Sequence, residues 1–172
     1  MRTLEDRYAL ALFELTRNEE GLCAGAQLLT GNAALWEALL NPCIPAAEKD
    51  RVLCRLLGQG DDPVLLSFFR LLCRRERLSL LPAVVERYHQ LKLKAEGGAQ
   101  GMFTCAREPS PEDLERVGEA LKKRRGLSKV EFQVVVDPQL LGGFVVQLEG
   151  VTYDKSVRSM LRGLRRSLKE RE

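Results

Sequence analysis

The sequence predicts an α+β protein, in which an N-terminal six-helix bundle (residues 1–96) is followed by a small C-terminal α/β domain (residues 102–172). Two patterns support this division. Apolar residues recur every three or four positions through most of the first region, which is typical of amphipathic helices. From Val130 to Val136 and from Phe144 to Leu148 they alternate instead, as in half-buried strands. The glycine-rich residues 97–101 are expected to form a hinge or the frayed end of the last helix.

Each predicted helix of the bundle is bounded by residues that favour caps or turns. Asn18 and Asn41-Pro42 suit the ends of the first and third helices, and Pro45 and Pro63 suit the first turns of the fourth and fifth. The short loops between the helices predict a compact arrangement. The helices are expected from Leu4 to about Asn18, from Glu19 to near Thr30, through Leu35–Leu40, from Pro45 to Leu57, from Pro63 to Cys73 and from about Ser79 to Ala95.

The C-terminal region predicts the element order β-α-β-β-α. Met102 to Cys105 is expected to form a short strand, and Ser110 is expected to cap the helix that follows. The two alternating runs, Val130 to Val136 and Phe144 to Leu148, are separated by a short connection rich in turn residues. Such a pair of runs favours an antiparallel hairpin.

An ordered set of turn and cap residues surrounds the second alternating run. Asp137-Pro138 ends the first run, because proline cannot donate a hydrogen bond within a central strand. Gly142-Gly143 precedes the second run, and Asp154 is expected to cap the last helix. That helix carries apolar residues on one face: Val157, Met160, Leu161, Leu164 and Leu168.

The composition favours a protein without catalytic chemistry. The chain has one histidine, His89, and its five cysteines show no C-x-x-C spacing, so neither a metal site nor a disulfide framework is predicted. No catalytic pair and no phosphate-binding loop can be assembled, and we expect no cofactor. No apolar run is long enough to span a membrane, and the acidic residues near the N-terminus argue against a targeting peptide.

Three segments carry a resemblance to a known family. VDPQLLGGFVVQL followed by YDKSVRSMLRGL resembles the C-terminal signature of the delta subunit of bacterial F-type ATP synthases, whose mitochondrial counterpart is the oligomycin-sensitivity-conferring protein. RYALALFEL is similar to the opening helix of that family, and FFRLLCRRERLSLLPAVVERYHQL to its fifth and sixth helices. The resemblance covers nearly the whole chain, more loosely between Gly21 and Gly60.

This resemblance implies a non-catalytic stator subunit of an ion-translocating ATP synthase. Such a subunit links the catalytic head, through the N-terminal helix of an alpha subunit, to the b subunits of the peripheral stalk, and resists the torque of the rotor. It implies a peripheral location on the cytoplasmic face of the cell membrane, with no insertion into the membrane and no nucleic acid. The alternative from another class is an RNA-binding helical regulator that uses the basic C-terminal helix.

Two surfaces are candidates for partner binding. The first and fifth predicted helices have more apolar width than a one-sided helix needs, so they either form the centre of the bundle or partly line a groove for an amphipathic helix. The last helix has a basic outer face, which is either simply solvated or contacts the stalk. The candidate residues are Tyr8, Ala11, Leu12, Leu65, Phe68, Phe69 and Leu72 for the first surface, and Arg158, Arg162, Arg165 and Arg166 for the second.

Overall fold

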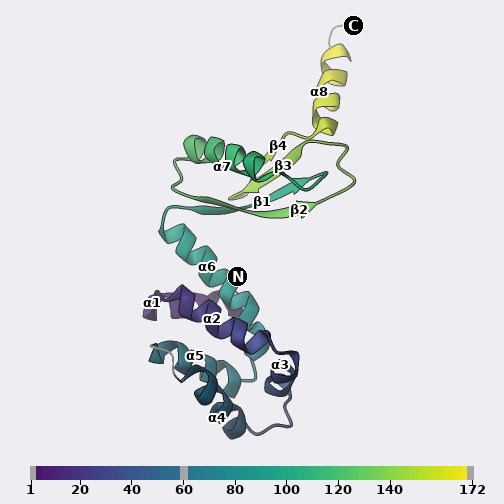
Figure 1. The fold of residues 1–172 in the computed structure, drawn as a ribbon. Helices are drawn as coiled ribbons and strands as arrows, with labels where there is room; N and C mark the ends of the chain where they lie inside the picture. The colour runs from purple at the N-terminus through teal and green to yellow at the C-terminus, as the bar shows by residue number, and fades with distance from the viewer. Residues whose placement is uncertain (1–2, 59–61, 170–172) are drawn as a thin grey trace. The chain divides into compact units, whose positions relative to one another are not determined.

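The computed structural model describes residues 3–58 and 62–169, with side chains described as far as Gly163. The chain divides between Lys92 and Leu93 into two compact units, called unit 1 and unit 2 below. Among the described residues, helices precede a mixed four-stranded sheet, as expected for an α+β protein. Figure 1 shows the order of the elements within each unit.

Unit 1 is helical, and polar side chains cap most of its helices. The Thr3 hydroxyl and the Asp6 carboxylate form a reciprocal capping box at the start of the first helix. Asn18, Asn32 and Asp62 each accept a hydrogen bond from a backbone N–H of the helix that follows. The elements are α1 (Leu4–Leu15), α2 (Glu19–Thr30), α3 (Ala33–Leu40), α4 (Ala46–Leu57), α5 (Pro63–Arg74), the 3-10 turn η1 (Leu78–Leu80) and α6 (Leu81–Ala95), whose last three residues fall in unit 2.

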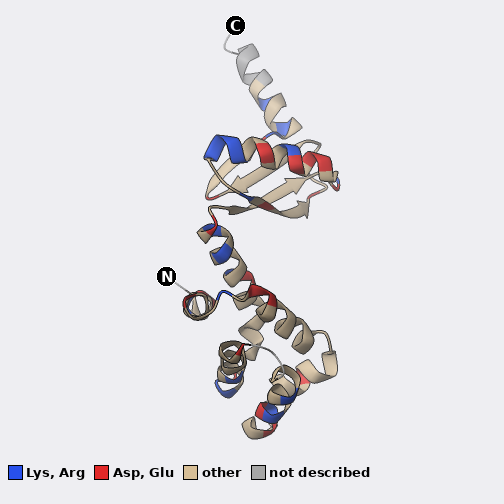
Figure 2. Cartoon of the chain, turned by 60° about the vertical axis from the view of Figure 1, so that its left-hand side comes forward, with Lys and Arg blue, Asp and Glu red and all other residues tan. Residues whose placement is uncertain are grey.

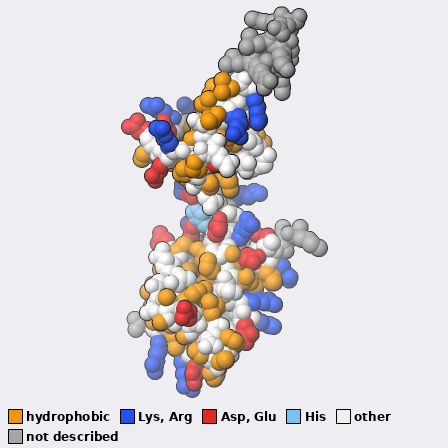
Figure 3. Space-filling model, turned by 90° about the vertical axis from the view of Figure 1, so that its right-hand side faces the viewer, with side chains coloured by type: hydrophobic (Ala, Val, Ile, Leu, Met, Phe, Trp, Pro, Cys, Tyr) orange, Lys and Arg blue, Asp and Glu red, His pale blue; other side chains and the backbone are white. Residues whose placement is uncertain are grey.

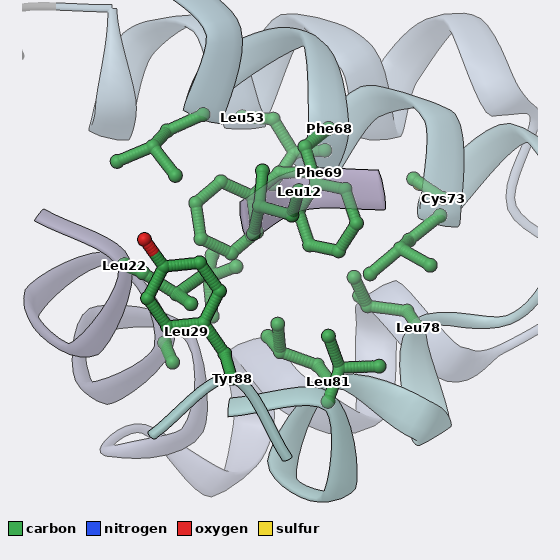
Figure 4. Packing of buried hydrophobic residues seen from close by; sticks show 14 of the residues in the cluster. Leu12, Leu22, Leu29, Leu53, Phe68, Phe69, Cys73, Leu78, Leu81 and Tyr88 are labelled. Atoms are coloured by element: carbon green, nitrogen blue, oxygen red, sulfur yellow. The ribbon is translucent and has the colours of Figure 1, made fainter. Parts of the chain in front are cut away.

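The core of unit 1 is built around two aromatic side chains, Phe69 and Tyr88. Phe69 is 1% exposed and Tyr88 is fully buried, and both lie among leucines from α1, α2, α4 and α6 (Figure 4). The Tyr88 hydroxyl donates a 2.8 Å hydrogen bond to the carbonyl oxygen of Thr16, so its polar end has a partner inside the protein. This bond holds α6 against the end of α1.

Unit 2 contains a four-stranded sheet with one helix packed against it. The strands β1 (Ala99–Cys105), β2 (Val130–Val136), β3 (Phe144–Leu148) and β4 (Val151–Asp154) lie in the order β2-β1-β3-β4. Helix α7 (Pro111–Arg125) contributes Leu121 to the core, and α8 (Val157–Lys169) follows β4. Acidic residues begin α7 and basic residues end it (Figure 2), a distribution that complements the helix dipole.

The predicted hairpin between β2 and β3 is wrong. Strand β1 lies between them, parallel to β2 and antiparallel to β3. Alternate residues of β1, namely Ala99, Gly101, Phe103 and Cys105, are all buried, as a central strand requires. The alternation of apolar residues indicated two strands, but it carries no information on which strands are neighbours.

The hairpin in unit 2 joins β3 to β4 instead. Val145 pairs with Asp154 and Leu148 with Val151. The intervening Glu149 and Gly150 have φ angles of 49° and 80°, the left-handed values that a two-residue hairpin turn needs at both positions. Sequence analysis missed β4 because it has four residues and lacks a clear alternation.

The predicted hinge at residues 97–101 overlaps β1, which begins at Ala99 rather than at Met102. Helix α6 ends just before it in a glycine cap. Gly97 has a φ of 75°, and the Gly98 N–H bonds the Leu93 carbonyl at 2.8 Å. Gly97 and Gly98 are therefore a helix cap, and Gly101 is part of the sheet. Whether this joint bends stays a prediction.

The Gly142-Gly143 pair lets the start of α8 lie directly beside the start of β3. The Val157 N–H donates to the Gly142 carbonyl at 3.0 Å, and the Lys155 N–H donates to the Phe144 carbonyl at 2.9 Å. A Cβ on Gly143 would lie 2.3 Å from the carbonyl oxygen of Lys155, and Gly143 has a φ of 78°. Only glycine fits this position.

Asp154 ends β4, and the cap of α8 is Ser156 rather than Asp154. The Ser156 hydroxyl accepts a hydrogen bond of 3.2 Å from the Ser159 N–H, and the buried Ser156 directly precedes the helix. Asp154 supports this cap, because its carboxylate accepts hydrogen bonds from the Ser159 hydroxyl and from the Ser156 N–H. These bonds hold the pKa of Asp154 below its ordinary value.

The first prediction concerns Gly143. Replacing Gly143 with alanine is expected to destabilise unit 2 by at least about 2 kcal/mol, because of the backbone clash and the left-handed φ. Amide hydrogen exchange across β3 and β4 measures this change. Gly163→Ala is the matched control, since Gly163 meets no neighbouring atom within 4 Å. Equal exchange in the two variants would contradict the role assigned to Gly143.

Candidate partner-binding surfaces

Two hydrogen bonds fix the position of α1 along α5. At one end, the Thr16 hydroxyl donates to the Asp62 carboxylate at 2.8 Å. At the other end, Arg77, just beyond α5, donates to the Tyr8 hydroxyl at 2.9 Å. The end of α1 therefore lies at the start of α5, and the two helices run antiparallel.

One face of α1 carries apolar residues that the core leaves partly or largely exposed. Leu4 is 42% exposed and Leu15 is 71% exposed, while Ala11 is exposed and Tyr8 is half-buried. These four residues are three or four positions apart, so they lie along one side of the helix. The buried residues of α1, Ala9 and Leu12, lie on the adjoining side, which faces the core.

A matching row on α5 meets this face. Leu71 is 44% exposed and Val64 is half-buried. Phe68 between them is 8% exposed and belongs to the core, and its ring packs edge-on against Tyr8 with 6.3 Å between the centroids. The two rows meet at Tyr8 and Phe68. We call the two rows the α1–α5 strip, which consists of Leu4, Tyr8, Ala11, Leu15, Val64, Phe68 and Leu71.

The seven residues predicted for this surface fall into two groups in the structure. Tyr8, Ala11 and Phe68 belong to the α1–α5 strip. Phe68 and the other four are all buried in the core of unit 1, which agrees with the alternative that they form its centre: Leu12, Leu65, Phe69 and Leu72. The sequence analysis missed Leu4, Leu15, Val64 and Leu71 on the strip. The three-or-four spacing of Leu4, Tyr8, Ala11 and Leu15 was the available signal.

Asp62 links this surface to the stability of unit 1. One carboxylate oxygen accepts the Thr16 hydroxyl, and the other accepts the N–H groups of Val64 and Leu65 as the cap of α5. The hydrogen bond from Thr16 is the main reason that the pKa of Asp62 is lowered. The ionised form of Asp62 is therefore the one that holds α1 and α5 in place.

Helix α8 forms the second candidate surface. Val157, Met160 and Leu161 are 37%, 56% and 54% exposed, so the described part of its apolar face lacks a covering element. Arg158 and Arg162 are exposed beside it, while the side chains of Arg165 and Arg166 lie outside what the structure describes. Figure 3 shows apolar and basic side chains together near the base of α8.

His89 takes part in a structural ion-pair cluster. Its Nδ1 lies 2.5 Å from the Glu19 carboxylate, which Lys92 also contacts at 2.7 Å. Partial burial raises the pKa of Glu19, but the hydrogen bonds from Lys92 and His89 outweigh it, so the pKa is lowered overall.

Across residues 3–58 and 62–169, we find no group of three or more potential metal ligands. The same residues include no helix long and apolar enough to cross a membrane.

The structure combines a helical unit that carries the apolar α1–α5 strip with an α/β unit that carries the exposed apolar face of α8. Residues 4–168 match the family described as the ATP synthase delta (OSCP) subunit. The chain belongs to this family, which confirms the predicted resemblance and supports the role of a stator subunit.

Individual relatives match along the full chain. ATP synthase subunit delta of Desulfotalea psychrophila is 30% identical, with 98% of this chain and 97% of the relative covered. That of Synechococcus sp. strain RCC307 gives the same identity and coverage. A chain of the Toxoplasma gondii mitochondrial ATP synthase hexamer has a similar fold, with a TM-score of 0.69, 19% identity, and 96% and 97% coverage. Nothing among these matches favours the RNA-binding alternative.

The second prediction concerns Asp62. Asp62→Ala is expected to destabilise unit 1 by about 1–2 kcal/mol, the usual cost of a lost helix cap. Because the pKa of Asp62 is lowered in the folded protein, its contribution is complete at neutral pH and is lost as the pH falls below about 4. Trp36 is the single tryptophan and lies in unit 1, so its fluorescence during urea unfolding measures the change. Glu14→Ala, at an exposed site of α1, is the control. A difference from wild type that does not shrink as the pH falls from 7 to below 4 would contradict this role.

Proposed function

We propose that this protein is the non-catalytic stator subunit that joins the catalytic head of an ATP synthase to its peripheral stalk. Unit 1 would bind the N-terminal helix of an alpha subunit, and unit 2 would bind the b subunits of the stalk. The observation that carries the proposal is the α1–α5 strip, together with membership of the delta family.

The shape and chemistry of the α1–α5 strip suit an amphipathic helix. Its rows, each with apolar residues three or four positions apart, run along two antiparallel helices. A partner helix lying along them would bury leucine side chains that water now contacts, such as Leu15 and Leu71. Each fully buried leucine contributes about 1.5–3 kcal/mol, so a few such contacts yield strong binding.

The exposed apolar face of α8 supports the second half of the proposal. Met160 and Leu161 are each more than half exposed on this face, and a cluster of exposed apolar side chains is typical of a protein-binding site. Arg158 and Arg162 would attract acidic residues of the stalk and orient the encounter. The described stretch of α8 thus offers apolar contact for affinity and cationic side chains for specificity.

The mechanism that follows is mechanical. The six helices of unit 1 would act as one rigid bundle on the head, and the subunit would work at the periphery of the membrane on its cytoplasmic face. Each tenfold gain in affinity corresponds to about 1.4 kcal/mol, so resistance to torque needs several such increments. Two binding sites on one chain supply part of this, because binding at one site raises the effective concentration at the other.

The third prediction tests the head-binding site. The full-length chain is expected to bind a peptide of the alpha-subunit N-terminus from the same organism, with little dependence on salt. Ala11→Arg and Leu71→Asp should each weaken binding at least tenfold, because they place a charge within an apolar contact. Calorimetric titration measures this. Leu28→Asp is the control, since Leu28 is 58% exposed on α2, outside the strip. If Leu71→Asp binds the peptide as tightly as wild type does, the proposal that the α1–α5 strip forms the interface is contradicted.

The fourth prediction tests the stalk-binding site. Binding of the soluble C-terminal segment of the b subunit is expected to weaken at least tenfold in Met160→Asp. The pair Arg158→Glu and Arg162→Glu should mainly slow association and reverse its salt dependence. Stopped-flow kinetics and calorimetry separate the two effects. Lys123→Glu, at an exposed site of α7, is the charge control. Steeply salt-dependent binding of RNA in place of the b segment would favour the RNA-binding alternative.

A further inference from the structure

A cavity of about 610 Å³ opens at one end of the sheet in unit 2. Its walls are the start of α7 and two loops, residues 106–109 and residues 141–143. Its apolar lining includes Phe103, Phe144, Val117 and Leu141. A volume in this range accommodates large side chains or a small ligand. We call it the sheet-end pocket.

The floor of the sheet-end pocket is built from closely packed aromatic rings. Phe103 is 2% exposed, and its ring stacks on Phe144 with the centroids 5.1 Å apart and the planes at 18°. Phe132 packs edge-on against the other side of Phe103, at 5.6 Å. The site is therefore formed before any partner arrives, which lowers the entropic cost of binding.

The wall of the pocket contains an apolar side chain with little contact to the rest of the protein. Leu141 lies in the loop between β2 and β3 and is 72% exposed, the largest exposure among the large apolar residues of the described chain. The same loop is held in place by the Asp137 N–H, which donates to the Cys105 carbonyl at 2.8 Å, and by the contacts of Gly142 and Gly143. The fold holds Leu141 at this position without burying it.

The pocket is continuous with the base of α8. Gly142 lines the pocket, and its carbonyl accepts the hydrogen bond from the N–H of Val157, the first residue of α8. The side chain of Val157 lies 3.1 Å from the position of a Cβ on Gly142. The first residue of α8 therefore lies against Gly142, the neighbour of Leu141 in the pocket wall.

Charge defines the kind of partner that the pocket and α8 fit. From Lys155 to Gly163 the chain carries three cations and no acidic residue. Arg107 and Arg116 add two exposed cations at the pocket, beside Glu108 and Asp113. A complementary partner carries acidic residues beside its apolar stripe where it faces α8, and a bulky apolar side chain where it reaches the pocket.

We propose that the sheet-end pocket receives the end of the partner helix that packs on α8, so that one amphipathic, acidic helix contacts both sites at once. This inference rests on the proposed binding of the stalk by unit 2. The pocket anchors the end of the helix through an apolar side chain held between Leu141 and Phe144. Helix α8 then contacts the preceding turns, and the pocket fixes how far the partner helix extends along unit 2.

The fifth prediction tests the pocket by calorimetric titration of the full-length chain with the soluble C-terminal segment of the b subunit. Leu141→Asp is expected to weaken binding about 10- to 100-fold, the factor for losing one buried leucine. Met102→Asp is the matched control, because Met102 is 42% exposed and alternates with Phe103, so it lies on the opposite face of the sheet. Formation of the complex should slow hydrogen exchange in residues 106–109 and 141–143. Exchange in the other loops of unit 2 should not change.

The outcomes separate this inference from the proposed function. If Met160→Asp abolishes binding while Leu141→Asp binds as wild type does, the stalk site stands and the pocket inference is overturned. If the wild-type chain does not bind the segment, both fail. A second copy of the chain could occupy the pocket instead of the b segment. Sedimentation of each variant without the segment measures this self-association. Self-association that Leu141→Asp removes, with binding of the b segment unchanged, would also overturn the inference.

Discussion

Thr16 joins three helices of unit 1 through its two oxygen atoms. Its hydroxyl donates to Asp62 at the start of α5, and its carbonyl accepts from Tyr88 of α6. Asp62 in turn caps α5, so the same carboxylate sets where α5 begins and how α1 lies beside it. The antiparallel pairing of α1 and α5 brings two apolar rows together, and the proposed contact with the head depends on that pairing.

Unit 2 has a comparable constraint at Gly143. The backbone of Lys155 and Ser156 lies so close to Gly143 that no side chain fits between them. This close approach fixes where α8 leaves the sheet and places its base next to the sheet-end pocket. Each unit therefore uses a few local contacts to present an apolar surface at a defined position. A subunit that must withstand torque benefits from surfaces formed before binding, because little ordering has to accompany association.

Local features were predictable from the sequence, and contacts between distant segments were not. The spacing of apolar residues, the break at Asn18 and the prolines Pro45 and Pro63 predicted the helices of unit 1, because these signals act within a few residues. The predicted pairing of β2 with β3 was wrong, because the position of β1 between them depends on pairing across about 30 residues. Helical spacing likewise marked Leu12 and Leu15 as apolar but did not show that the first is buried and the second exposed.

Simultaneous binding of two partners is the central claim, and a sedimentation experiment on a ternary mixture tests it most directly. The full-length chain would be mixed with the alpha-subunit N-terminal peptide and the soluble b segment from the same organism, each labelled with a different chromophore. Our account predicts one species in which both labels sediment with the chain, at unchanged affinity for each partner. Mutually exclusive binding, with one label displaced as the other is added, would contradict it.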